Sequence, residues 1–364
     1  MVRLFGTELT RREVETRIGR LDQIGGVQPF ELTDGRARGV RALRLITGSG
    51  LSVTSLIDRA LDLAHAEFRG IPLCWRSENG DVAPTYYEPE DDEWLRTHFG
   101  GLVTTCGLTN FGPAGSDGYG TFGLHGRVSC LPAAGVRWSE EWQGDECMLE
   151  VSGTVAQTRV FGENLHLHRR VRTWLGSSSL WLDDTVANHG SERTPHMILY
   201  HWNPGFPILS ESSRLYVSHE AMRPRDPEAA KGLEVWDRGG PPQAGFKEQV
   251  FVHTPIACAD GRAVAALVNR GLLDGQGLGI SIHFDPQQLP AFIQWRMLGQ
   301  GTYVMGLEPA NCPTIEGRVE AGRRGTLPFL EPGEQRSYSL ELRVLDGSQQ
   351  IDTVIQQIDD ANGR

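Results

Sequence analysis

Two histidines and one glutamate stand in sequence surroundings that favour proton-transfer chemistry. Glycines flank His125 in a G-L-H-G-R segment, which lets the backbone and a ligand approach closely. His201 lies in Y-H-W-N-P-G, where a strand-like segment turns, and Glu308 ends an apolar segment just before a proline. An imidazole and a carboxyl group in apolar, aromatic surroundings are what general acid–base catalysis needs near neutral pH. Burial also raises the pKa of a glutamate toward that range, which makes it a better base.

A structural role is the alternative for each of these residues. His125 also suits a hydrogen bond with a loop carbonyl, His201 a satisfied position in the core, and Glu308 a turn cap or an ion pair with an arginine. For any one of them alone we favour the structural interpretation. The three together indicate a catalytic site, because general acid–base chemistry needs both residue types.

The segments around these residues have the pattern of an all-β protein with few, short helices. Residues 146–190 alternate apolar and polar side chains, which predicts a meander of antiparallel strands. Further strands are expected at 40–57, 279–284, 291–295, 302–307 and 338–344. Helices are expected at Thr10–Ile24, where Thr10 and Glu13 have the spacing of a capping box, and at 350–361.

One large domain is expected, because the composition does not shift along the chain. We expect residues 1–38 to form a helical or extended segment packed on a single domain of residues 39–364. The polar segments 77–98 and 220–247 are rich in proline or glycine, so we expect them to leave the sheet and cover a site.

Charge and cysteine content exclude several classes of protein. The chain has 364 residues and a net charge of −11, and such a surface repels phosphate backbones, so no nucleic-acid partner is expected. No run of about 18 apolar residues predicts a membrane span, and residues 1–12 lack the apolar stretch of an export signal. The six cysteines form no C-x-x-C pair, which favours reduced thiols and a cytoplasmic location.

Four motifs, in their order along the chain, resemble those of the aldose 1-epimerase superfamily. They are G-L-V-T-T-C-G-L-T-N at 101–110, L-H-G-R at 124–127, Y-H-W-N-P-G-F-P at 200–207 and G-L-E-P-A-N at 306–311. The chain is most similar to a poorly characterised, aldose 1-epimerase-like branch, over roughly residues 40–345. The resemblance implies a galactose mutarotase-like β-supersandwich of antiparallel strands, with a sugar-binding cleft on one broad face.

The resemblance also implies an activity, the interconversion of the α and β anomers of an aldose or a close derivative. By motif, His201 matches the histidine that gives a proton to the ring oxygen, and Glu308 matches the glutamate that takes one from the anomeric hydroxyl. His125 matches a second histidine near the reacting end of the sugar. After ring opening, rotation about C1–C2 and reversed proton transfers close the ring on the other face. The chemistry requires no metal or organic cofactor, and the implied partner is a small-molecule sugar.

This chain departs from the family where a sugar-gripping arginine is expected. Family members carry Asn-Arg where this chain has Asn110-Phe111, and Asn110 stays a predicted binding residue. Arg59 or Arg296 is our substitute for the missing guanidinium. Asp62 is our candidate for the substrate-binding aspartate of the family, and His253 for the same part of the cleft. A structural ion pair is the alternative for each arginine.

Three tryptophans, Trp75, Trp202 and Trp295, are candidate platforms for the apolar face of a sugar ring, with core packing as the alternative. Trp202 is favoured because it follows His201, and Asn203 beside it completes the predicted binding residues. Adjacent strand residues face opposite ways, so His201 and Trp202 serve one site only if the backbone turns at the Pro-Gly that follows.

Other functions remain alternatives. A non-catalytic carbohydrate-binding protein on the same fold would keep the aromatic residues without needing Glu308 buried beside His201. A sugar-phosphate 1-epimerase would need basic side chains at one end of the cleft, for which the sequence offers Arg69, Arg76 and Arg127.

A metal-dependent, cupin-like enzyme is the least favoured alternative. His166 and His168 share a strand face as an H-x-H ligand pair would, but the arginines that follow oppose a cation, so no metal site is predicted. The identity of the sugar and the oligomeric state, for which a homodimer is one option, are left open.

Overall fold

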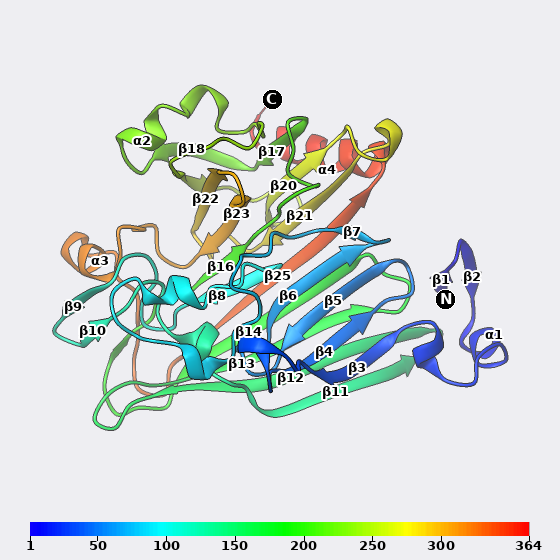
Figure 1. The fold of residues 1–364 in the computed structure, drawn as a ribbon, viewed down its shortest axis with the longest axis horizontal. Coiled ribbons are helices and arrows are strands. Elements are labelled where there is room, and N and C mark those ends of the chain that lie inside the picture. The colour runs from blue at the N-terminus through cyan, green and yellow to red at the C-terminus, as the bar shows by residue number, and fades with distance from the viewer. Residues whose placement is uncertain (364) are drawn as a thin grey trace.

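Two large antiparallel sheets form the body of the protein, of which the computed structural model describes residues 1–363 (Figure 1). The strands of the first sheet are β3 (Gly26–Glu31), β4 (Arg41–Ile46), β5 (Leu51–Leu56), β6 (Asp62–Phe68), β7 (Ile71–Pro72), β8 (Val103–Cys106), β16 (Leu199–Trp202), β18 (His219–Pro224), β19 (Gln249–Pro255), β22 (Ala291–Leu298) and β23 (Tyr303–Ala310). Those of the second are β11 (Ala134–Gln143), β12 (Glu146–Thr158), β13 (Asn164–Trp174), β14 (Ser179–Asn188), β17 (Ser213–Val217), β20 (Ala263–Asn269), β21 (Leu278–Phe284) and β25 (Gln335–Asp346).

The strand order brings distant parts of the chain together. The first sheet runs β18-β19-β22-β23-β16-β8-β6-β5-β4-β3, with β7 paired to β6, and the second runs β11-β12-β13-β14-β25-β21-β20-β17. In the first sheet β16 is placed between β8 and β23, strands that come from three separate parts of the sequence. The all-β prediction is confirmed, and the meander expected at 146–190 is formed by β12, β13 and β14 in consecutive antiparallel pairs.

Three two-stranded sheets, four α-helices and seven short 3-10 helices complete the regular structure of the described residues. The small sheets pair β1 (Val2–Leu4) with β2 (Thr7–Leu9), β9 (Gly115–Asp117) with β10 (Gly120–Phe122), and β15 (Thr194–Pro195) with β24 (Phe329–Leu330). The α-helices are α1 (Arg11–Glu15), α2 (Pro227–Ala230), α3 (Arg318–Arg324) and α4 (Ser348–Ala361). Among residues 1–363, no helix combines the length and the apolar character needed to cross a membrane.

The N-terminal segment corrects one helix prediction. The capping box of Thr10 and Glu13 is present, but α1 ends at Glu15 rather than at Ile24. Gly19 follows α1, and the chain resumes as a separate 3-10 helix at Leu21–Gln23, so a glycine interrupts the expected helix. The segment 1–38 also contributes β3 to the first sheet, and its separation from the remaining domain stays a prediction.

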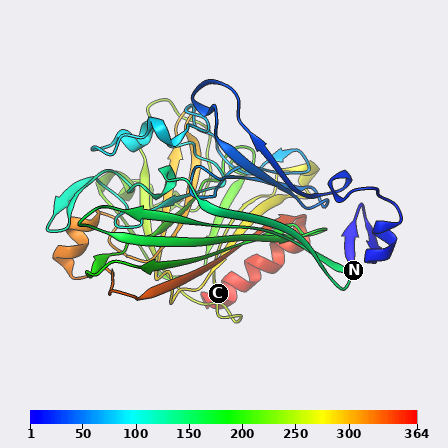
Figure 2. The same ribbon diagram turned by 90° about the horizontal axis from the view of Figure 1, so that it is seen from below.

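The core lies between the two large sheets, which Figure 2 shows as two layers with α4 against the outer side of the second. The inner faces bury leucine, valine and isoleucine side chains from both sheets. Strand β20 is buried on both faces, because Ala263, Ala265 and Leu267 join the core while Val264, Ala266 and Val268 pack with α4. The six cysteines are buried and their thiols are free.

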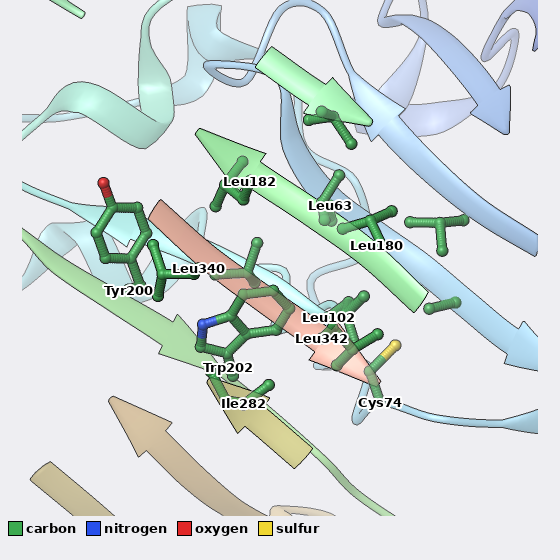
Figure 3. Packing of buried hydrophobic residues seen from close by; sticks show 14 of the residues in the cluster. Leu63, Cys74, Leu102, Leu180, Leu182, Tyr200, Trp202, Ile282, Leu340 and Leu342 are labelled. Carbon is green, nitrogen blue, oxygen red and sulfur yellow. The ribbon is translucent and has the colours of Figure 1, made fainter. Parts of the chain in front are cut away.

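Figure 3 shows Trp202 inside this core, near Leu340, Leu342 and Ile282. Its side chain is fully buried and points between the sheets. This corrects the prediction that Trp202 is a sugar platform. The backbone continues as a strand through Trp202, so His201 and Trp202 face opposite sides of the sheet.

Candidate active site

A cavity of about 760 Å³ lies on the face of the first sheet opposite the core, over β16, β19, β22 and β23. Segment 77–98 contributes Asp91, Asp92, Trp94, Leu95 and His98 to its lining. Segment 220–247 contributes Arg225 alone, and the expectation that it leaves the sheet is wrong for its first residues, which form β18 at the edge of the first sheet. The polar and aromatic side chains of its lining include His98, His125, His201, Arg225, Glu248, Trp295 and Glu308.

His201 and Glu308 meet at the base of this cavity. Strands β16 and β23 pair antiparallel, with Leu199 opposite Ala310 and Trp202 opposite Leu307, and this register sets His201 across from Glu308. His201 Nε2 lies 3.3 Å from Glu308 Oε1, and their side chains are 7% and 5% exposed. The structure thus brings together two of the predicted catalytic residues, one from each of two neighbouring strands.

Gly306 has no side chain, and this provides the space that the His201–Glu308 pair occupies. Gly306 lies two residues before Glu308 on β23 and therefore on the same face of the sheet. A Cβ atom there would clash with Glu308 Oε1 and would lie 3.2 Å from His201 Cε1. The Cβ would also lie 2.9 Å from Trp295 Cβ, so a side chain at position 306 would displace Glu308, Trp295 or His201.

Two more imidazoles surround His201. The ring centroid of His125 lies 6.1 Å from that of His201, and the ring of His98 lies 5.7 Å away. Trp94 packs against both rings, at 4.4 Å from His98 and 4.8 Å from His125. The predicted residue His125 is therefore part of the same cluster, whereas sequence reasoning missed His98, which follows no recognisable motif.

The loop that carries His125 fixes the ring by hydrogen bonds. His125 has a φ of +56°, which is uncommon for a residue with a side chain. Its backbone N–H donates to Gly112 O at 2.9 Å, and the Gly112 N–H donates to His125 Nδ1 at 3.4 Å. Because Nδ1 accepts, the neutral ring carries its proton on Nε2.

Burial determines the charge of the cluster. It lowers the pKa of His201 to about 3 and that of His125 to about 4, and it lowers the pKa of His98 well below its usual range. Burial raises the pKa of Glu308 well above its usual range, and the Glu248 carboxylate adds to the rise. Although the His201–Glu308 distance suits an ion pair, the neutral form is favoured, with the proton on Glu308.

Several buried polar atoms at this position lack a hydrogen-bond partner. Within residues 1–363, His98 Nδ1, His201 Nδ1 and Glu308 Oε1 are buried and unpaired. Each such atom costs about 1–3 kcal/mol, and such groups are retained where function needs them.

An ion-paired arginine lines the outer part of the cavity. Arg225 Nη2 donates to Glu248 Oε1 at 2.8 Å, and Trp295 Nε1 donates to Glu248 Oε2 at 2.8 Å. Arg225 Nε donates to Asp226 at 2.8 Å. The indole of Trp295 lies 5.4 Å from the His201 ring, so an aromatic face and a guanidinium border the reacting pair. Sequence reasoning missed Arg225, whose signal was its place in the segment 220–247.

The remaining charges around the cavity are acidic. Asp91, Asp92, Glu248 and Glu316 line it together with the single arginine, Arg225. Because Arg225 is already paired with two carboxylates, the cavity offers no free cation among its described residues.

The structure places Arg59 and Asp62 away from the cavity, which corrects both binding-site predictions. The buried guanidinium of Arg59 donates to the carbonyl groups of Ser129, Val82 and Thr97 and so ties three loops together. Buried Asp62 pairs with Arg169, from Oδ1 to Nη1 at 2.6 Å. Both charges are satisfied inside the protein, where an unpaired charge would be costly.

Arg296 and His253 also lie outside the cavity. Arg296 donates to Gln249 Oε1 at 2.8 Å and to Arg238 O at 3.2 Å. His253 Nδ1 lies 2.7 Å from His219 Nδ1, and burial lowers the pKa of His253 to about 3. Both side chains hold neighbouring segments against β19 and β22.

Three further predicted residues surround the cavity without lining it. Trp75 packs behind it, with its ring 6.3 Å from that of Trp295 and 5.9 Å from that of His98. The side chain of Asn203 donates to Gly100 O and His201 O. The side chain of Asn110 donates to Gly123 O and lines a second cavity.

The H-x-H pair does not form a metal site. His166 Nε2 lies 3.0 Å from Asn164 Oδ1, and its ring packs against His189. His168 Nδ1 lies 3.3 Å from the Thr154 hydroxyl. Across the part of the chain that the structure describes, no group of three or more His, Cys, Asp or Glu side chains is arranged to hold a metal ion.

One family model and several solved structures match this chain. The family described as domain of unknown function DUF4432 matches residues 37–344, and no protein with curated annotation matches. The chain is similar to a structure described as a "putative aldose 1-epimerase" from Klebsiella pneumoniae, with 26% identity and a TM-score of 0.86. That match covers 93% of this chain and 88% of the other.

More distant structures share the fold alone. A galactose 1-epimerase from Lactobacillus acidophilus is 14% identical, with a TM-score of 0.58 over 89% of this chain and 100% of its own. A galactose mutarotase-like protein from Clostridium acetobutylicum is 13% identical, with a TM-score of 0.58 over 89% of this chain and 99% of its own. The two sheets described above therefore form a galactose mutarotase-like sandwich, as the motifs predicted.

Proposed function

The chain belongs to the DUF4432 family and has the galactose mutarotase-like fold, and from this premise we propose that it is a cofactor-independent sugar isomerase. It interconverts the α and β anomers of an aldose or a close derivative. One observation carries the proposal: His201 Nε2 lies 3.3 Å from Glu308 Oε1 at the base of a cavity of about 760 Å³. The similar structures described as a "putative aldose 1-epimerase" and a galactose 1-epimerase support the same reaction class.

The His201–Glu308 pair can supply both the proton donor and the proton acceptor that ring opening needs. Opening a pyranose requires one group that protonates the ring oxygen and one that accepts the proton of the anomeric hydroxyl. The pair holds one proton, which burial keeps on Glu308 while the cavity is free. Transfer across 3.3 Å gives the form in which His201 donates and Glu308 accepts.

Ring opening returns this pair to its uncharged form. When His201 has given its proton and Glu308 has taken one, the imidazole is again neutral and the carboxyl group is again protonated. The apolar surroundings stabilise that form over the ion pair. Rotation about C1–C2 then presents the other face of the aldehyde, and the reverse transfers close the ring.

The rest of the cavity suits the body of a sugar. The indole of Trp295 offers a flat apolar face beside His201, as a pyranose ring prefers. Arg225 and Glu248 offer charged groups that hydrogen-bond sugar hydroxyls, and Arg225 takes the place of the guanidinium expected at position 111. His125, whose ring nitrogen Nε2 carries its proton, is a donor close to the reacting pair.

The charges favour an uncharged sugar over a sugar phosphate. A phosphate group needs free basic side chains, whereas Arg225 is paired twice and four other carboxyl side chains line the cavity. Arg69 is paired with Asp346 and Arg76 with Asp81, and Arg127, the third arginine considered, lines the second cavity rather than this one. This argues against the sugar-phosphate alternative. We also propose a cytoplasmic location, because the cysteines are buried and unpaired.

Exchange between anomers tests the proposal directly. A panel of aldoses is followed by NMR saturation exchange with the wild-type protein, with Glu308→Gln and with Glu228→Gln, an acidic residue of α2 that lies outside the cavity. We expect Glu308→Gln to slow exchange at least about 100-fold and the control to leave it unchanged. Sugar binding without exchange by the wild-type protein would support the carbohydrate-binding alternative, and full exchange by Glu308→Gln would remove Glu308 from the mechanism.

A further inference from the structure

A second cavity, of about 1010 Å³, is separated from the candidate active site by the loop that carries His125. Leu124 and His125 line the first cavity, whereas Gly123, Gly126 and Arg127 line the second. The hairpin of β9 and β10, the turn between β12 and β13, the segment before β15 and one residue of α3 also line it. No residue lines both cavities, so they are distinct sites.

The charge of the second cavity is opposite to that of the first. Four arginines line it, against two glutamates, Glu163 and Glu192. The protein as a whole has a net charge of −11, so a basic cavity is not a property of the average surface.

The four arginines differ in how far they are neutralised. Arg318 is 4% exposed and makes a bidentate pair with Asp117, at 2.8 and 2.7 Å. Arg193 pairs with Glu331 at 3.1 Å on the surface, and Arg159 lies 3.5 Å from Glu163.

Arg127 is the arginine left available for a ligand. Within residues 1–363 its guanidinium has no ion pair and no hydrogen bond, and it is half-buried. Its backbone is fixed, because the Arg127 N–H donates to Gly107 O at 3.1 Å and the neighbouring Gly126 O accepts from Tyr87 Oη at 3.2 Å. A planar fork held on a fixed backbone is suited to a carboxylate or a phosphate group.

The uncharged part of the lining suits a hydroxylated molecule. Asn164 and Thr121 offer an amide and a hydroxyl group, and Tyr119 and Phe161 are exposed aromatic rings. Aromatic rings with nearby polar groups pack against sugar rings. The cavity therefore combines a basic anchor with contacts for a polyol.

We propose that this second cavity binds an anionic sugar, that is, a monosaccharide with a phosphate or carboxylate group, and that Arg127 is its anchor. The anion is held by the guanidinium of Arg127, and Arg159 and Arg193, whose ion pairs lie on the surface, line the same cavity. The ring lies against the aromatic and hydroxyl groups of the same wall. This site is independent of the isomerase function proposed for the first cavity.

Calorimetric titration with four probes tests the proposal: glucose 6-phosphate, glucuronate, glucose and inorganic phosphate. We expect one of the two anionic sugars to bind at least 10-fold more tightly than both glucose and inorganic phosphate. Tighter binding of glucose 6-phosphate would identify the anionic group as phosphate, and tighter binding of glucuronate would identify it as carboxylate. Equal binding of glucose, or of inorganic phosphate, would overturn the proposal, as would a lack of binding of both anionic sugars.

Matched variants locate the bound anion. Arg127→Gln should weaken binding at least 10-fold and Arg127→Lys less, because lysine keeps the charge and loses the fork. The side chain of Arg127 has no partner in the described chain, so these variants should fold, which their melting temperatures check. Arg12→Gln, at an exposed arginine of α1, should change nothing. Unchanged binding in Arg127→Gln, or binding abolished instead by Arg225→Gln in the first cavity, would contradict the assignment.

Discussion

The carboxyl group of Glu308 lies 3.3 Å from the imidazole of His201, across one antiparallel strand pair. Directly opposed residues of neighbouring strands hold their side chains close together without help from loops. The distance is therefore a property of the sheet, and the buried setting of both groups determines which of them carries the proton.

Two outer residues are expected to tune Glu308 in opposite directions. The Glu248 carboxylate raises the pKa of Glu308, and the Arg225 guanidinium opposes that rise. Glu248→Gln should thus lower the pKa of Glu308, and Arg225→Gln should raise it. The carboxyl carbon of Glu308, followed by ¹³C NMR against pH, measures both shifts independently of activity.

A purely structural role of the Arg225–Glu248 pair predicts a different result. In that case the two variants would move the pKa of Glu308 in the same direction or not at all. Glu228→Gln is the control, because Glu228 pairs with Lys231 on the surface of α2, outside the cavity. If Glu228→Gln shifted the pKa of Glu308 as much as Glu248→Gln does, the shift could not be attributed to the charges next to Glu308.

The buried imidazole of His201 makes the protein sensitive to acid. Its pKa is about 3 in the folded protein and near 6.5 in the unfolded chain, so the unfolded state binds more protons between these values. Stability then rises with pH in this window and is lost as pH falls from about 6.5 toward 3. As pH falls below 6, the free energy of unfolding of His201→Gln should rise relative to that of the wild type by about 1.4 kcal/mol per pH unit.

Unfolding by denaturant at pH 6.5, 5.5 and 4.5 measures this difference. His65→Gln is the matched control, because His65 is exposed on β6 and should follow the wild type at each pH. A constant difference between His201→Gln and the wild type across this range would show that His201 does not stay neutral in the folded protein.

Local pattern predicted β12, β13 and β14 well, because these half-buried strands alternate apolar and polar side chains. It missed others of the two large sheets, among them β6, β19 and β20, which are buried over most of their length. Contacts between side chains that are distant in the sequence could not be predicted in this way. Nothing near Arg59 indicates that its guanidinium binds three backbone carbonyls, and nothing near Arg225 indicates that it faces Glu248. Those contacts depend on how loops return over the sheets. His201 and Glu308 were recognised from motifs, but their opposition depends on the register of β16 with β23.

The space beside the reacting pair gives a third prediction. Gly306→Ala places a Cβ against Glu308 Oε1 and 3.2 Å from His201 Cε1, so the two groups must move apart. Misplacing reacting groups by about 1 Å costs on the order of 100-fold in rate. We expect anomer exchange to fall by that amount while the circular dichroism spectrum stays that of the wild type.

Gly118→Ala is the control for this variant. An added Cβ at Gly118 meets no atom within 4 Å, and its backbone does not require glycine. It should keep wild-type exchange. Full activity of Gly306→Ala would mean that the His201–Glu308 geometry at rest is not the geometry that reacts.

Two tryptophans on the same sheet should separate stability from sugar binding. Trp202 is fully buried between the sheets, whereas Trp295 borders the cavity and donates its indole N–H to Glu248. Trp202→Phe should lower the free energy of unfolding by about 1–3 kcal/mol because it leaves a void in the core, and should leave sugar affinity unchanged. Trp295→Phe should weaken sugar binding several-fold with less effect on stability, because it removes ring area from the cavity wall and frees Glu248 to move.

Denaturant unfolding and sugar titration of both variants make this comparison. The pair is informative because each variant removes the same atoms from opposite faces of the first sheet, so a general effect of losing an indole would lower both quantities in both proteins. Weaker sugar binding by Trp202→Phe at unchanged stability would instead indicate that Trp202 contacts the sugar. That outcome would require β16 to present two consecutive side chains to the same cavity, which an extended strand does not do.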